Sequence, residues 1–145
     1  MESIYSNNLF FTASLIELIA RKTNNTKKYV VKKLGKETMK KIYTLAEVYH
    51  SENIDKVVYD FVNEFDIELG NYKLDIKNNV PSYWEIGRVY QRLVKKIDSN
   101  PNNYIDILYE VLTSWIIEHI DNYDSSLYYE NPDYIYECYK EEKII

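Results

Sequence analysis

Hydrophobic residues recur at three- and four-residue steps along most of the chain, which is the pattern of amphipathic helices. This pattern predicts a first helix over residues 7–22, a short second helix over 27–34 and a third over 37–49. Gly35 lies between the second and third segments, where a glycine often ends a helix. Residues 54–65 carry the clearest apolar stripe, and Ser51 or Asn53 is the expected N-cap of that helix.

The second half of the chain shows the same periodicity after an interruption. Periodicity fades over residues 66–81, so we expect a long loop there, with a short extended stretch. Ser82 and Glu85 have the spacing of a capping box and predict a helix over 82–97. A sixth helix is expected over 103–121. Asn131 and Pro132 begin a last short helix, because proline suits the first helical turn.

Composition agrees with an all-α fold. The 145 residues include only 3 Gly and 3 Pro, and so few turn-forming residues favour helices joined by short loops over a β-sandwich. Hydrophobic residues make up 46% of the chain, enough for one core without a metal or disulfide staple. The sequence therefore predicts a single-domain bundle of six to seven helices over residues 1–145, with one long loop at 66–81.

The chain carries the signals of a cytoplasmic protein. Cys138 is the single cysteine and cannot form an internal disulfide, which fits a reducing compartment. The first apolar run lacks a basic segment before it and a small-residue cleavage site after it, so we interpret it as a helix. No apolar run approaches the roughly 20 residues that cross a bilayer. We therefore expect no membrane association.

Charge is distributed unevenly along the chain. Residues 1–50 hold nine Lys or Arg against four Asp or Glu, whereas residues 51–145 hold nine against nineteen. The front half is therefore basic and the back half acidic, within a net charge of −5.

Half of the basic charge falls within residues 21–41, and clustered cations are what nucleic-acid binding requires. The candidate basic patch comprises Lys27, Lys28, Lys32, Lys33, Lys36, Lys40 and Lys41. The two helices around Gly35 superficially resemble a helix-turn-helix. However, only Arg21 in this stretch could make bidentate contacts to a base, and the chain as a whole is acidic. A solvated lysine face and a contact with an acidic protein surface remain alternatives.

Tyrosine is unusually abundant, with 16 Tyr against 4 Phe and 2 Trp. Tyr and Trp often anchor protein interfaces, because they combine a large apolar ring with a polar group. The candidate partner-binding residues are Tyr83, Trp84, Tyr128, Tyr129 and Tyr134. Packing at the edge of the core, or an abundance of Tyr from coding bias, would explain the same residues without a partner.

Catalytic and metal-binding signatures are missing from the sequence. His50 and His119 lie on different predicted helices, and neither belongs to a recognisable catalytic motif. The HxxxH spacing does not occur, and the glycine-rich phosphate-binding motifs are also missing. We therefore expect no cofactor and no metal. An enzyme using His50 or His119 remains an alternative.

Four segments of the sequence resemble a family of small bacterial helical proteins. They are IELIARKT, LGKETMKKIYTLAEVYHSENIDKV, VPSYWEIGRVYQRL and YYENPDYIYECYK. That family is associated with compact operons that also encode a second short helical protein and an ADP-ribosyltransferase-like toxin candidate. The resemblance implies an antitoxin or accessory role in a toxin–antitoxin or defence-type system, and it assigns no site residues. The leading hypothesis is a non-enzymatic protein-interaction module with an operon-encoded toxin as its partner, and a nucleic-acid-binding regulator is the alternative.

Overall fold

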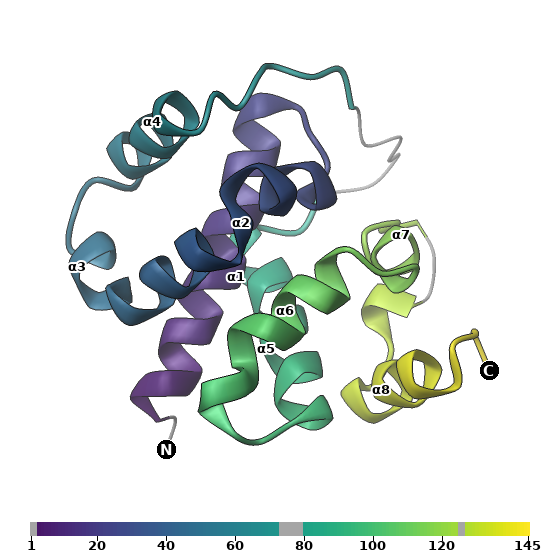
Figure 1. The fold of residues 1–145 in the computed structure, drawn as a ribbon. Coiled ribbons are helices and arrows are strands. Elements are labelled where there is room, and N and C mark those ends of the chain that lie inside the picture. Colours follow the sequence, from purple (N-terminus) through teal and green to yellow (C-terminus); the bar gives the residue numbers. More distant parts are fainter. Residues whose placement is uncertain (1–2, 73–79, 125–126) are drawn as a thin grey trace.

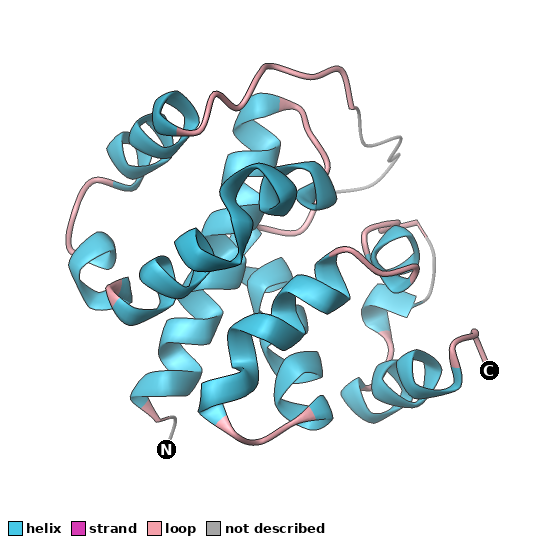
Figure 2. Cartoon of the chain, viewed as in Figure 1, coloured by secondary structure: helices cyan, strands magenta, loops and turns pink. Residues whose placement is uncertain are grey.

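The computed structural model describes residues 3–72, 80–124 and 127–145. Within these ranges every regular element is a helix and no strand occurs (Figure 2). The elements are α1 (Ile4–Thr23), α2 (Lys27–Thr44), α3 (Ala46–His50), α4 (Ile54–Glu64), α5 (Tyr83–Ile97), η1 (Pro101–Asn103), α6 (Tyr104–Leu112), α7 (Ile116–Ile120), η2 (Leu127–Tyr129) and α8 (Pro132–Glu141). The all-α prediction is confirmed, with eight α-helices in the described residues instead of six to seven.

Helix α1 lies at the centre of the bundle (Figure 1). It packs mainly against α5 and α2 and also contacts α3, α4 and α6. Every residue from 11 to 20 is buried, so this part of the helix is enclosed on all sides. An apolar stripe on one face is typical of a surface helix, whereas burial on all sides marks a core helix. Polar residues of this stretch, such as Glu17, are therefore forced into the interior and need partners there.

The boundaries of the second and third predicted helices differ from the structure. Helix α2 runs from Lys27 to Thr44 with a kink at Gly35, where φ is 79°. That conformation suits glycine and ends the first half of the helix, as expected, but the chain resumes its helical path at once. Leu45 then separates α2 from α3.

The predicted helix over 103–121 is two helices, which corrects the sequence-based boundary. Helix α6 ends at Leu112 and α7 begins at Ile116. In the interval, the Thr113 hydroxyl donates to the Tyr109 carbonyl at 2.8 Å and the Ser114 hydroxyl donates to the Val111 carbonyl at 2.7 Å. Two consecutive hydroxyl residues that compete for backbone carbonyls explain the break.

Other predicted helix starts are confirmed by their caps. The Asn53, Ser82 and Asn131 side chains accept backbone hydrogen bonds at the first turns of α4, α5 and α8. The expected loop at 66–81 is free of helix and strand in its described parts, and residues 73–79 lie outside the described residues. None of the described helices is both long and apolar enough to cross a membrane.

The segment after α4 returns to the end of α1. The Gly70 amide donates to the Thr23 carbonyl at 2.8 Å, and the Tyr72 amide donates to the Asn24 carbonyl at 2.9 Å. The Asn25 side chain also donates to the Glu68 carbonyl at 2.7 Å. These bonds hold Tyr72 beside the junction of α1 and α2.

Candidate functional site

Three of the five predicted partner-binding aromatic residues lie in one groove, which we call the aromatic groove. It has a volume of about 540 Å³ and is formed by α5, η2 and the start of α8, with Phe10 contributed by α1. Its lining residues are Phe10, Trp84, Glu85, Arg88, Val89, Arg92, Leu93, Tyr128, Tyr129, Glu130, Pro132 and Ile135. Trp84 is distant in sequence from the consecutive residues Tyr128 and Tyr129, and all three share this surface.

The aromatic groove is organised by ring contacts. The Phe10 and Trp84 ring centroids are 5.4 Å apart, and the Arg88 guanidinium lies 4.1 Å from the Phe10 centroid. Tyr128 and Tyr129 meet edge to face at 4.8 Å, and Tyr129 remains 63% exposed. The groove therefore presents aromatic surface that no other described part of the protein covers.

The other two predicted aromatic residues lie outside the aromatic groove. Tyr83 packs against the Trp84 ring at 4.7 Å but does not line the groove. Tyr134 lies on α8, and its hydroxyl donates to the carbonyl of Ile145 at the end of the chain. The structure therefore gives Tyr134 a local contact within the protein.

The predicted basic patch is only partly a surface. Lys27 is 3% exposed and belongs to a buried ion-pair cluster, so its inclusion in the patch is wrong. Its position, immediately after Thr26 at the α2 N-terminus, points it inward against α1. Lys36 and Lys40 each approach Asp106 of α6, at 3.7 and 3.6 Å. The remaining residues of the patch are exposed along α2: Lys28, Lys32, Lys33 and Lys41.

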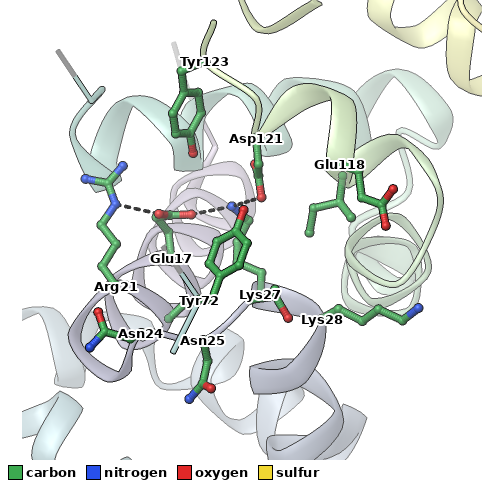
Figure 3. Close-up of a pocket in the computed structure, with 13 residues that line it drawn as sticks. Glu17, Arg21, Asn24, Asn25, Lys27, Lys28, Tyr72, Glu118, Asp121 and Tyr123 are labelled. Carbon is green, nitrogen blue, oxygen red and sulfur yellow. Dashed lines mark hydrogen bonds and ion pairs between the residues drawn. The ribbon is translucent and has the colours of Figure 1, made fainter. Parts of the chain in front are cut away.

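The buried cluster around Lys27 was not predicted from the sequence (Figure 3). The Lys27 ammonium lies 2.7 Å from Asp121 Oδ2 and also pairs with Glu17 Oε1. Arg21 Nε donates to Glu17 Oε2 at 2.6 Å, and the Tyr90 hydroxyl donates to Asp121 Oδ1 at 2.8 Å. Four charged side chains and one tyrosine therefore join α1, α2, α5 and the end of α7.

The electrostatics of this cluster keep Lys27 charged. Burial by itself lowers the pKa of Lys27, but the carboxylates of Asp121 and Glu17 outweigh burial and raise that pKa. The ammonium also lies 5.0 Å from the Tyr90 ring centroid, a favourable cation–π position. Burial raises the pKa of Asp121, and Lys27 opposes this effect. The two carboxylates therefore favour the charged ammonium at Lys27.

A pocket of about 570 Å³ opens above the cluster, and we call it the charge pocket. Its lining residues are Glu17, Ala20, Arg21, Asn24, Asn25, Thr26, Lys27, Lys28, Tyr72, Ile117, Glu118, Asp121 and Tyr123. The hydroxyls of Tyr72 and Tyr123 point toward the Glu17–Lys27–Asp121 cluster from two sides (Figure 3). Tyr123 is 2% exposed and Tyr72 is 43% exposed.

The two sites are neighbours in the structure. The Tyr123 ring of the charge pocket meets the Tyr128 ring of the aromatic groove edge to face, with centroids 5.3 Å apart. The sites nevertheless have no lining residue in common.

The histidines and the cysteine line neither site, although His50 contacts the groove residue Trp84. His50 is exposed beside the rings of Phe11 and Trp84, at 5.5 and 5.9 Å, and His119 is exposed against the Trp115 ring at 5.4 Å. Cys138 is fully buried. Within the described parts of the chain, no three His, Cys, Asp or Glu side chains lie close enough to hold a metal ion.

A weak sequence signal for the charge pocket was available in retrospect. Glu17 interrupts the apolar run of α1, and Arg21 follows it at the four-residue spacing of a helical ion pair. The other partners, Lys27 and Asp121, are distant in sequence and meet only in the folded chain.

Comparisons with protein-family models, with curated proteins and with solved structures found no match to this chain. Functional proposals therefore rest on the chemistry of the aromatic groove and the charge pocket.

Proposed function

We propose that this protein is a non-enzymatic protein-interaction module that holds its partner in the aromatic groove. The supporting observation is the convergence of Trp84, Tyr128 and Tyr129 with Arg88 and Arg92 on one concave surface. Trp, Tyr and Arg are the residues that most often dominate the binding energy of protein interfaces. Ring contacts within the groove already order Trp84 and Tyr128, so binding a partner would cost these side chains little conformational entropy.

The chemistry of the aromatic groove specifies the partner segment. An apolar or aromatic side chain of the partner would fill the space between Trp84 and Tyr129. The rim carries exposed charges of both signs: Arg92 is basic, and Glu85 and Glu130 are acidic. A partner segment with an acidic and a basic residue on either side of an apolar anchor would match this rim.

A narrower proposal follows from the resemblance to a family from toxin–antitoxin-like operons. The partner would be the toxin candidate encoded beside this chain, and this protein would be an antitoxin or accessory component. Co-expression with the products of the neighbouring genes tests it: we expect one of them to co-purify in a stable complex. A chain that remains free beside every neighbouring gene product would contradict the antitoxin proposal.

The role of the aromatic groove is tested separately with matched tyrosine variants. Tyr129→Ala removes an exposed groove residue, whereas Tyr59→Ala removes a 67% exposed tyrosine on α4, outside the groove. We expect Tyr129→Ala to weaken binding of the co-purifying partner by about tenfold or more, as for an interface hot spot. Tyr59→Ala should bind as the wild type does. Equal affinities for both variants would place the interface elsewhere.

A further inference from the structure

We propose that the charge pocket binds a small uncharged ring compound that carries several hydroxyl groups. A free sugar and the ribose of a nucleoside both have this chemistry. The inference concerns a site distinct from the aromatic groove and does not depend on the protein-interaction proposal.

The first supporting observation is the position of the Tyr123 hydroxyl in the wall of the charge pocket. The Tyr123 side chain is 2% exposed, and it lines the pocket. It points toward Glu17 and Asp121 at the base of the pocket (Figure 3). A ligand hydroxyl in the pocket would exchange a hydrogen bond with the Tyr123 hydroxyl at this position.

The lining of the charge pocket favours a ligand rich in hydrogen-bond donors. Glu17, Glu118 and Asp121 provide carboxylate oxygens, and each such oxygen can accept more than one hydrogen bond. Lys27, Arg21 and Tyr90 use only part of this capacity in the buried cluster. Several hydroxyl groups would donate to the remaining positions and accept from the Tyr72 and Tyr123 hydroxyls.

The charge balance of the lining favours an uncharged ligand. Three acidic residues, Glu17, Glu118 and Asp121, are matched by three basic residues, Arg21, Lys27 and Lys28. The cluster at the base already pairs its own charges. A charged ligand would therefore lose its hydration on binding without gaining an oppositely charged partner.

Size and apolar lining agree with a single ring compound. About 570 Å³ lies within the range of small-molecule sites. Ala20, Ile117 and the Tyr72 ring provide apolar surface against which the carbon face of a sugar ring would pack.

Isothermal titration calorimetry with glucose, galactose, mannose, ribose, adenosine and uridine tests the proposal. Backbone amide NMR shifts of Lys27, Asp121 and Tyr123 report where each probe binds. We expect at least one probe to bind saturably in the millimolar range or tighter and to shift these amides. Binding of adenosine or uridine without binding of ribose would identify a nucleoside, whereas binding of a hexose would identify a free sugar.

Variants of the lining tyrosines connect binding to the charge pocket. Tyr123→Phe keeps the ring and removes the hydroxyl, so we expect the affinity to fall about three- to tenfold. Tyr72→Ala changes an exposed wall residue and gives an independent test if Tyr123→Phe disturbs folding. The matched control, Tyr59→Ala on α4, outside both sites, should leave the affinity unchanged.

Three outcomes would overturn the inference. The first is that none of the six probes binds saturably to the wild-type protein. The second is that a probe binds equally well to the wild type, Tyr123→Phe and Tyr72→Ala. The third concerns charge: glucose 6-phosphate binding more tightly than glucose would show that the pocket prefers an anion.

Discussion

The Lys27 ammonium lies 2.7 Å from Asp121 Oδ2, although 94 positions separate the two residues in the chain. Lys27 opens α2, and Asp121 follows directly after α7. Glu17 of α1 completes the buried arrangement by pairing with the same ammonium. One buried cation therefore compensates two carboxylates from separate parts of the bundle.

Lys27→Met should destabilise the protein by about 3–5 kcal/mol, because it leaves the buried Glu17 and Asp121 carboxylates without their shared cation. Urea unfolding followed by circular dichroism measures this change. Lys28→Met is the matched control, since Lys28 is exposed at the adjacent position, and it should change stability by less than about 0.5 kcal/mol. Adding Glu17→Gln and Asp121→Asn to Lys27→Met should restore part of the loss. No recovery in the triple variant would contradict the electrostatic explanation.

Stability should fall as pH rises above about 10. Burial raises the pKa of Tyr90 and Tyr123 above the ordinary 10.0, and the Glu17 and Asp121 carboxylates raise the pKa of Lys27 above 10.5 against the effect of burial. At high pH the unfolded state therefore loses protons that the folded state keeps. Each such group lowers the free energy of unfolding by about 1.4 kcal/mol per pH unit in that range. Urea unfolding at several pH values between about 8 and 11 measures the free energy of unfolding. A free energy of unfolding that stayed constant or rose over that range would contradict this prediction.

Gly87→Ala should destabilise the packing of α5 on α1. A Cβ at position 87 would lie 1.9 Å from Ser14 Oγ and 2.9 Å from Ser14 Cβ. The overlap should cost about 1–3 kcal/mol, more than the helix propensity that alanine gains over glycine. Thermal unfolding measures the effect. The double variant Ser14→Gly/Gly87→Ala makes room at the same crossing and should recover part of the loss, whereas an unchanged melting temperature in Gly87→Ala would contradict the close contact.

Ser14→Ala should leave stability unchanged or raise it by up to about 1 kcal/mol. Ser14 Oγ is buried and has no hydrogen-bond partner in the described structure. Removing an unsatisfied polar atom eliminates its desolvation penalty, and alanine also favours the helix. Thr12→Ala on the same helix is a useful comparison, because the Thr12 hydroxyl donates to the Asn8 carbonyl at 2.8 Å. A loss of stability in Ser14→Ala larger than in Thr12→Ala would indicate a partner for Ser14.

Gly70→Ala should detach the segment that positions Tyr72. A Cβ at position 70 would lie 2.2 Å from Asn25 Oδ1 and 2.6 Å from the Asn24 carbonyl oxygen. The backbone bonds from Gly70 and Tyr72 to the end of α1 would be strained or lost. We expect faster amide hydrogen exchange at Tyr72, with Asn71→Ala as the exposed neighbouring control. Exchange at Tyr72 that matches the wild type in both variants would contradict this close approach.

The fold class could be predicted from the sequence because it depends on local periodicity. The stripe at 54–65 and the caps at Ser82 and Asn131 lead to α4, α5 and α8 with small boundary errors. The split between α6 and α7 was missed because apolar periodicity continues through it, while Thr113 and Ser114 turn the backbone locally. Trp84, Tyr128 and Tyr129 were identified by residue type, whereas their shared groove depends on how α5 and η2 meet.

By itself, the sequence determined where helices form, since three- and four-residue spacing and capping residues act within a few positions of each other. It also determined that the chain has surplus aromatic side chains and an uneven charge. Only the tertiary structure decided which charges are buried. Lys27 looks like one solvated lysine among seven, and it becomes a core residue because folding places Glu17 and Asp121 beside it. Contacts between residues so distant in sequence follow from packing the whole chain, which no local pattern encodes.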